Sequence, residues 1–123
     1  MTLLLDTHVV LWWISGARVR RAVRSAIEDA DEVFVSVASA WEVAIKVALG
    51  KLALPGRFED GVEAHGFSKL PIEFRHAEAL VALPRHHADP FDRMLVAQAL
   101  VEGMTLVTRD GALRAYGVPI LVA

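Results

Sequence analysis

The chain alternates between short, fully apolar runs and longer stretches in which apolar and polar positions recur with a helical period. Leu3 to Leu5 form an unbroken apolar run of the kind that is buried on both faces of a parallel sheet. Similar runs at 33–35, 105–107 and 119–122 predict three further strands, and 69–72 is a weaker candidate. The chain therefore carries at least four short candidate strands, well separated along its length.

Helical patterns lie between these strands. Apolar positions at three- and four-residue spacing within 19–27 predict an amphipathic helix with an arginine-rich outer face. Residues 41–49 predict a helix that ends at Gly50, and 91–102 predict a helix that begins after Pro90 and ends at Gly103. The spacing of glycine and proline predicts two connecting helices, one within 51–67 and one at 75–83.

Short strands that alternate with helices are typical of a parallel sheet covered on both faces. We therefore expect a three-layer α/β/α sandwich with a short-stranded, mainly parallel central sheet, formed by a single domain over residues 1–123. A chain of this length can bury a core without disulfides, and it contains no cysteine, which excludes thiolate chemistry and favours the cytoplasm.

The apolar content changes this picture in one respect. Hydrophobic residues make up 54% of the chain, yet runs such as 9–14 fall well short of the roughly 18 residues that cross a membrane. The sequence therefore predicts no membrane span. Surplus apolar surface is expected to contact a protein partner or a second copy of the chain.

Four carboxylates occupy positions that matter in such a fold. Asp6 follows the first strand, and Asp110 comes shortly after the strand at 105–107. Glu42 is expected in the first turn of the 41–49 helix, and Asp92 opens the helix at 91–102. Ligands of open parallel sheets bind beyond the carboxyl ends of the strands, where the strand order reverses. We expect the four side chains to converge there.

Each carboxylate also has a simpler interpretation as a helix cap. Ser39 and Glu42 match a capping box, Asp89 can cap the helix that carries Asp92, and Asp6 or Asp110 can cap the structure that follows it. Taken singly, each residue fits a cap better than a ligand. The capping interpretation weakens when all four are predicted to meet at one edge of the sheet.

Converging carboxylates repel one another unless a cation neutralises them. Oxygen ligands without cysteine favour a hard ion, Mg²⁺ or Mn²⁺, which usually also binds water and substrate phosphate. The sequence thus suggests hydrolysis of a phosphodiester by metal-activated water. Asp6 and Asp92 are the expected direct ligands, Glu42 a ligand or a holder of water on the ion, and Asp110 a ligand of a second or weaker ion.

The net charge of −2 by itself argues against a purely electrostatic nucleic-acid binder. If four of the 15 acidic residues hold a cation, however, 11 remain against 13 basic residues. The charge outside the predicted site is then compatible with a polyanionic substrate.

The segments "LLLDTHVVLWW", "VSVASAWEVAIKVALGKL", "DPFDRMLVAQAL", "LVTRD" and "YGVPIL" occur in this order over nearly the whole chain. Together they resemble the PIN-domain family, and within it the VapC-type toxins of toxin–antitoxin pairs. The resemblance implies a PIN-like fold and a Mg²⁺- or Mn²⁺-dependent endoribonuclease. It also implies a homodimer that is held inactive by a cognate antitoxin, a segment of which occupies the active-site groove.

The resemblance assigns the family's acidic positions to Asp6, Glu42, Asp92 and Asp110, and its small hydroxyl after the last strand to Thr108. Asp92 is preferred to Asp89 because "DRMLVAQAL" matches the family's acid-led apolar helix, so that Asp89 becomes the N-cap. Many members carry an asparagine or a further acid after the last strand, which makes Asp110 the least secure of the four.

Several neighbouring residues are candidates for substrate binding or for support of the site. Arg93 and Arg109 each lie beside a predicted site acid and could bind substrate phosphate. His8 could contact phosphate or water on the ion, or simply begin a helix, and Ser36 could bond a site carboxylate or cap a helix.

Other polar and aromatic residues receive simpler interpretations. His86 and His87, in a loop flanked by proline, are predicted to be solvated, as is the arginine-rich face at 18–24. The three tryptophans could stack bases but are predicted to lie in the core or in a dimer interface; they are Trp12, Trp13 and Trp41.

Three rival classes are less well supported. A haloacid-dehalogenase-like, Mg²⁺-dependent phosphatase needs a second acid two residues after Asp6, where His8 stands. A phosphorylatable receiver domain needs early paired acids and a lysine after a late strand, where Arg109 stands. A catalytically degenerate PIN-fold binding module stays open, although such a module gains nothing from four gathered carboxylates.

Overall fold

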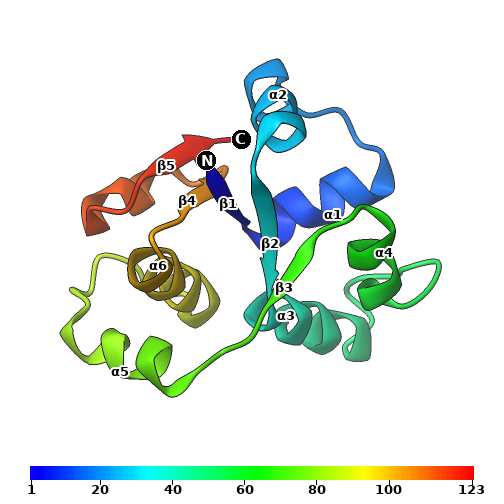
Figure 1. Ribbon diagram of the computed structural model, residues 1–123. Coiled ribbons are helices and arrows are strands. Elements are labelled where there is room, and N and C mark those ends of the chain that lie inside the picture. Colours follow the sequence, from blue (N-terminus) through cyan, green and yellow to red (C-terminus); the bar gives the residue numbers. More distant parts are fainter.

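The computed structural model describes residues 1–123 and shows five parallel strands in the order β3-β2-β1-β4-β5 (Figure 1). The strands are β1 (Thr2–Leu5), β2 (Glu32–Ser36), β3 (Ser68–Leu70), β4 (Thr105–Thr108) and β5 (Ile120–Val122). The predicted parallel sheet is confirmed, and the weaker candidate strand forms one of its edges.

Five of the six α-helices correspond to predicted helices, whereas the first, α1 (Thr7–Ser15), was not predicted. The other five are α2 (Arg21–Asp29), α3 (Val37–Ala48), α4 (Phe58–Ala64), α5 (Phe74–Ala82) and α6 (Pro90–Glu102), and a 3₁₀ helix, η1 (Gly111–Tyr116), precedes β5. As predicted, α6 begins at Pro90 after an Asp89 cap and ends at Gly103, which has a positive φ of 69°. Glycine adopts this left-handed conformation without the penalty of a Cβ atom.

The central strand divides its leucines between two cores, one on each face of the sheet. Leu3 and Leu5 pack against α1, α2 and α4, whereas Leu4 packs against α6, α3 and η1. Helix α5 lies outside α6, as Figure 1 shows. All three leucines are fully buried, which explains the unbroken apolar run and confirms the predicted α/β/α sandwich.

The strand order reverses between β1 and β4. From β1 the chain first adds β2 and β3 on one side and later adds β4 and β5 on the other. Leu5 of β1 lies opposite Val107 of β4, and the amide of Asp6 donates to the Val107 carbonyl at 2.9 Å. The residues that follow these two strands therefore emerge side by side at the carboxyl edge of the sheet.

Helix α3 begins earlier than predicted. Strand β2 runs directly into it, and Ser36 serves as the N-cap by accepting a hydrogen bond from the Ala38 amide at 2.9 Å. The predicted capping box of Ser39 and Glu42 is therefore wrong, because both residues lie inside the helix and Glu42 is in its second turn. This shift places the two side chains deep in the structure rather than at a helix end.

The tryptophans occupy different environments. Trp12 and Trp13 pack against the α1-side core, as predicted. Trp41 was predicted to lie in the core or in a dimer interface; its placement in the core is wrong, since it is 59% exposed and packs edge-on against Phe91 at 5.1 Å between ring centroids. Its alternative, the dimer interface, stays a prediction.

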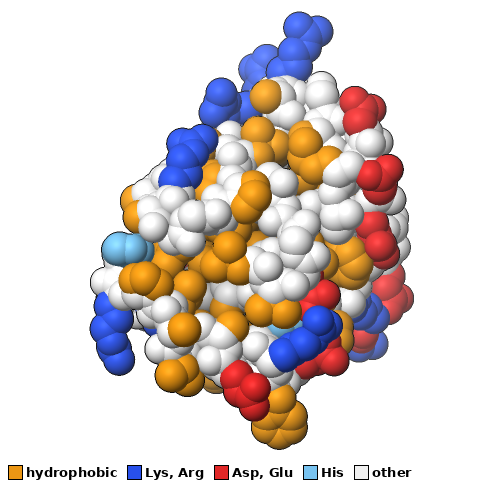
Figure 2. All heavy atoms as spheres, turned by 60° about the vertical axis from the view of Figure 1, so that its left-hand side comes forward, with side chains coloured by type: hydrophobic (Ala, Val, Ile, Leu, Met, Phe, Trp, Pro, Cys, Tyr) orange, Lys and Arg blue, Asp and Glu red, His pale blue; other side chains and the backbone are white.

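Apolar side chains reach the surface in several places. Phe74 and Val81 on α5 are 87% and 90% exposed. Figure 2 shows hydrophobic side chains scattered over the centre of one face, with basic side chains above them and acidic side chains along its right-hand edge. None of the helices combines the length and apolar character that would be needed to cross a membrane.

Candidate active site

The predicted site residues come from four elements that meet at the carboxyl edge of the sheet. Asp6 directly follows β1, and Thr108 ends β4 two residues before Asp110. Glu42 reaches this edge from α3 and Asp92 from the first turn of α6. The position is the one that parallel sheets favour for ligands, where neighbouring connections leave in opposite directions.

Asp6 is held rigidly and is almost completely buried. It caps α1, since its Oδ1 accepts from the Val9 amide at 2.9 Å, and its Oδ2 accepts from the Thr108 hydroxyl at 2.5 Å. Burial raises the pKa of Asp6 above its ordinary value of 3.8, although the hydrogen bonds from Thr108 and Val9 and the nearby positive charge of Arg109 oppose this effect. Asp6 is thus both a helix cap and a destabilised anion.

Glu42 is fixed by partners from two helices. Its Oε1 accepts from the Thr7 hydroxyl at 2.7 Å, and its Oε2 pairs with the Lys46 ammonium at 2.9 Å, one turn further along α3. The Ser39 hydroxyl lies 3.0 Å from the Thr7 oxygen. These buried hydroxyls connect Glu42 to the residue that directly follows Asp6.

Asp92 shows most clearly that the carboxylates converge. Its pKa is raised to about 6, first by burial and then by the negative charge of Asp89, Asp6 and Glu42, whereas His87 lowers it. Like charges have this effect only when they lie close together. Asp89 accepts from the amides of Phe91 and Asp92 at 2.8 and 3.2 Å, so it is the N-cap of α6, as predicted.

Asp110 lies between β4 and η1, two residues after Thr108. Its amide donates to the Thr108 hydroxyl oxygen at 3.1 Å, so that Thr108 joins Asp6 and Asp110 through one side chain. The Oδ1 of Asp110 accepts from the Ala112 amide at 3.0 Å and caps η1. Its Oδ2 lies 3.0 Å from the Nε2 of His87.

The sequence prediction missed His87. We expected both histidines of the loop before α6 to be solvated, and His86 is indeed exposed. The side chain of His87 is only 28% exposed, and its Nε2 lies 3.0 Å from Asp110 and 3.7 Å from Asp92. The signal that could have identified it is its position directly before the segment that carries Asp89 and Asp92.

The two candidate arginines are placed differently. Arg109 lies at the rim of the site, where its guanidinium is 3.3 Å from the Nε2 of His8 and sits over the Trp12 ring at 5.9 Å. Arg93 instead donates to the carbonyl of Pro84 at 2.7 Å and contacts the Tyr116 hydroxyl at 3.1 Å. Arg109 is available to an anion at the rim, whereas Arg93 secures the loop before α6.

Ser36, at the end of β2, connects α3 to the buried side chain of Gln98 on α6. Its hydroxyl caps α3 and lies 2.5 Å from the Oε1 of Gln98, which is fully buried on α6. The Gln98 amide donates to the Pro71 carbonyl at 3.2 Å and lies 3.4 Å from the Nδ1 of His76. Ser36 therefore supports α3 and α6 rather than touching a predicted site carboxylate.

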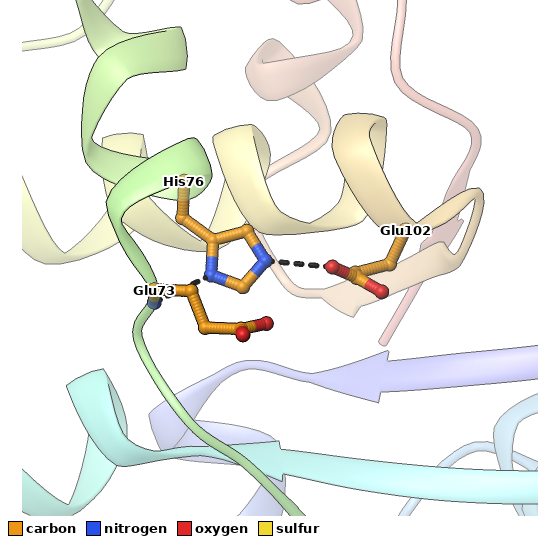
Figure 3. A group of neighbouring side chains, drawn as sticks. All are labelled: Glu73, His76 and Glu102. Carbon is orange, nitrogen blue, oxygen red and sulfur yellow. Dashed lines mark hydrogen bonds and ion pairs between the residues drawn. The ribbon is translucent and has the colours of Figure 1, made fainter.

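Figure 3 shows the second cluster, in which the His76 ring lies between Glu73 and Glu102. The Nδ1 of His76 accepts from the Glu73 amide at 3.0 Å, so the ring proton is on Nε2, which donates to Glu102 at 2.7 Å. Arg75 already pairs with both carboxylates, at 2.8 and 2.6 Å. Glu73 and His76 cap α5, and the charged groups of the cluster pair with one another. The cluster therefore needs no bound cation.

The four predicted site carboxylates, here called the acidic centre, are Asp6, Glu42, Asp92 and Asp110. Unlike the His76 cluster, the acidic centre leaves Asp6 and Asp92 without a basic side chain within hydrogen-bond distance. The hydrogen-bond donors to Asp6 are a hydroxyl and an amide, and the nearest side-chain nitrogen to Asp92 is the Nε2 of His87, at 3.7 Å. Burial raises the pKa of both carboxylates. A set of buried, mutually repelling oxygen ligands fits a hard divalent cation, which would remove the repulsion.

Comparison with known proteins agrees with this reading of the fold and the motifs. The PIN domain family model matches residues 3–119. Ribonuclease VapC22 of Mycobacterium tuberculosis is 35% identical to this chain over 127 aligned residues, which cover 96% of this chain and 94% of that protein.

Solved structures share the fold at lower identity. A chain in the crystal structure of VapBC2 from Rickettsia felis bound to a DNA fragment from their promoter superposes with a TM-score of 0.74 at 11% identity, covering 99% of this chain and 98% of that one. A toxin–antitoxin complex from Klebsiella pneumoniae gives a TM-score of 0.67 at 22% identity, covering 98% and 96%. With the match to the family model, these findings show that the chain belongs to the PIN domain family.

Proposed function

We propose that this chain is a metal-dependent endoribonuclease and the toxin component of a toxin–antitoxin pair. The observation that carries the proposal is the placement of the Asp6, Glu42 and Asp92 carboxylates at the carboxyl edge of the sheet, where the strand order reverses. Burial, followed by the negative charge of Asp89 and smaller effects of Asp6 and Glu42, raises the pKa of Asp92 to about 6. The names of the relatives support the same reading, since one is a ribonuclease and another is part of a toxin–antitoxin complex.

Mg²⁺ or Mn²⁺ is the proposed cofactor, because the candidate ligands are carboxylate oxygens. Asp6 and Asp92 are the proposed direct ligands, and Asp110 is the proposed ligand of a second or weaker ion. When bound, such an ion would make water a better nucleophile and neutralise charge that develops on the phosphodiester.

The chain's own residues prepare this centre. Thr108 and the Val9 amide fix the orientation of Asp6, and Thr7 fixes that of Glu42, so these carboxylates need no reorganisation when substrate arrives. Arg109 and His8 at the rim are the proposed contacts for substrate phosphate. RNA is the proposed substrate.

Two surfaces support the proposed protein partners. A groove of about 910 Å³ between α1, α4 and the 52–57 segment begins at His8 and Trp12, beside the acidic centre, and its lining is largely apolar. On α3, Val37, Trp41 and Ile45 are exposed at four-residue spacing. We propose that the groove region receives an antitoxin segment and that the α3 stripe contributes to a homodimer.

The decisive experiment is cleavage of labelled structured and single-stranded RNAs by purified, antitoxin-free protein. The conditions are Mg²⁺, Mn²⁺ and EDTA, with Asp6→Asn and, as a matched control, Asp29→Asn at the exposed end of α2. We expect metal-dependent cleavage that the D6N variant loses by at least about a hundredfold, while D29N retains it.

Either of two results would overturn the proposal. Undiminished cleavage by D6N would remove Asp6 from the centre. Absence of cleavage under every condition, together with absence of Mn²⁺ binding by calorimetry, would favour a catalytically degenerate PIN-fold binding module.

A further inference from the structure

The loop before α6 places a histidine between two of the carboxylates. The Nε2 of His87 lies 3.0 Å from the Oδ2 of Asp110 and 3.7 Å from the Oδ2 of Asp92. The other ring nitrogen, Nδ1, accepts a hydrogen bond from the Asp89 amide at 3.1 Å. Both nitrogens of the ring therefore have partners, one on each side.

These partners determine where the ring carries its proton. An amide N–H can only donate, so the Nδ1 of His87 must present a lone pair to Asp89. The proton of the neutral ring is consequently on Nε2, and Nε2 donates it to the Asp110 carboxylate. A nitrogen that carries a proton has no lone pair for a cation, so His87 is placed as a donor and not as a metal ligand.

Hydrogen bonds also hold the backbone of the loop that carries His87. The His87 amide donates to the Tyr116 hydroxyl at 2.8 Å, and Arg93 also contacts this hydroxyl while it donates to the Pro84 carbonyl. Tyr116 is buried at the end of η1, the helix that Asp110 caps. The loop, η1 and the start of α6 are thus joined around one phenol, which fixes His87 relative to Asp110.

Two donors restrain the Asp110 carboxylate. Its Oδ1 accepts from the Ala112 amide, and its Oδ2 accepts from His87, so that two donors at different oxygens set the plane of the carboxylate. Without His87 only the Ala112 contact would restrain it, and the side chain could rotate about its Cβ–Cγ bond.

We propose that His87 is a positioning residue, an Nε2–H donor that holds the Asp110 carboxylate in its working orientation within the acidic centre. This inference rests on the proposed nuclease function for its effect on cleavage, but the protonation of the ring follows from the hydrogen bonds alone.

Two substitutions separate the two contacts of the ring. In His87→Gln the amide nitrogen can occupy the place of Nε2 and donate to Asp110, whereas in His87→Asn the shorter side chain can contact only the Asp89 amide. We expect H87N to lower kcat on the order of tenfold to a hundredfold with KM within about twofold, and H87Q to recover most of that loss. His65→Asn, at an exposed histidine after α4, is the control.

Equal losses in H87Q and H87N, or no loss in either, would overturn the proposal. Thermal melting of each variant accompanies the kinetics, and a kcat loss in H87N without a large fall in melting temperature is the expected pattern.

A second measurement does not depend on cleavage. Long-range ¹H–¹⁵N correlation spectra of the imidazoles at pH 8, compared with H87Q to assign the signals, should show His87 as the Nε2–H tautomer with and without Mg²⁺. The Nδ1–H tautomer would overturn the proposal even if the protein cleaves RNA. If the wild-type protein cleaves nothing while the tautomer is as expected, the proposed function fails and the assignment of His87 as a donor survives.

Discussion

Replacing Asp92 with asparagine should stabilise the metal-free protein at neutral pH. The Asp92 carboxylate is 26% exposed, and burial together with the charges of Asp89, Asp6 and Glu42 raises its pKa to about 6. The nearest side-chain nitrogen, the Nε2 of His87, lies 3.7 Å away, beyond hydrogen-bond distance. Asparagine keeps the size of the side chain and removes the charge that the folded protein accommodates badly.

The magnitude follows from the pKa. At about 1.4 kcal/mol for each pH unit between the ordinary value of 3.8 and about 6, ionisation of Asp92 costs the folded state about 3 kcal/mol. An acid in the first turn of a helix stabilises it by roughly 0.3–1 kcal/mol, which asparagine forfeits. We therefore expect Asp92→Asn to raise the free energy of unfolding by about 2 kcal/mol at pH 8.

The sign of the pH dependence follows from the same shift. Because folding raises the pKa of Asp92, the folded protein binds more protons than the unfolded chain between pH 3.8 and about 6. The contribution of Asp92 to stability therefore falls as the pH rises through this interval and is constant above it. The advantage of the D92N variant should grow over the same interval.

Urea denaturation of both proteins in EDTA, from pH 4 to pH 8, measures this difference directly. A difference that does not change with pH, or a D92N variant that is less stable than wild type at pH 8, would refute the reasoning. In a parallel series, Mg²⁺ should raise the urea midpoint of the wild-type protein more than that of D92N, because only the wild type keeps this proposed ligand.

Three further predictions test hydrogen bonds of residues that surround the acidic centre. Thr108→Val removes the hydroxyl that donates to Asp6, and it should lower the free energy of unfolding by about 1.5–3 kcal/mol in urea titrations at pH 8; no change would show that this bond is weak. Ser36→Ala removes the α3 cap and should cost about 1–2 kcal/mol in the same assay, unlike Ser25→Ala on the exposed face of α2. Arg93→Ala should speed amide hydrogen exchange of His87 at least about tenfold, and unchanged protection would show that the arginine does not hold the loop.

Local signals account for what the sequence predicted well. The strands were visible because β1 and β4 are buried on both faces and need continuous apolar runs. The ends of α6 were visible because Asp89, Pro90 and Gly103 each satisfy a local backbone requirement. The position of Asp6 followed from the parallel topology, because a residue directly after a central strand lies at the carboxyl edge of the sheet.

The errors arose where distant residues decide the structure. Ser39 and Glu42 match a capping box in sequence, but α3 starts at Val37 with Ser36 as its cap, because β2 leads directly into it, and the Thr7 hydroxyl donates to Glu42 instead. His87 was predicted to be solvated because its partner Asp110 is 23 residues away. Neither contact leaves a trace in the local pattern of apolar and polar positions.

The bond between Thr108 and Asp6 has a consequence for synthesis on the ribosome. The two residues are separated by 102 positions, and β1 pairs with β4 only after nearly the whole intervening chain exists. Long-range contacts of this kind form late in folding. A nascent chain that has not yet extended past β4 therefore cannot assemble the acidic centre, so the proposed nuclease is inert until the ribosome has passed the codons for this strand.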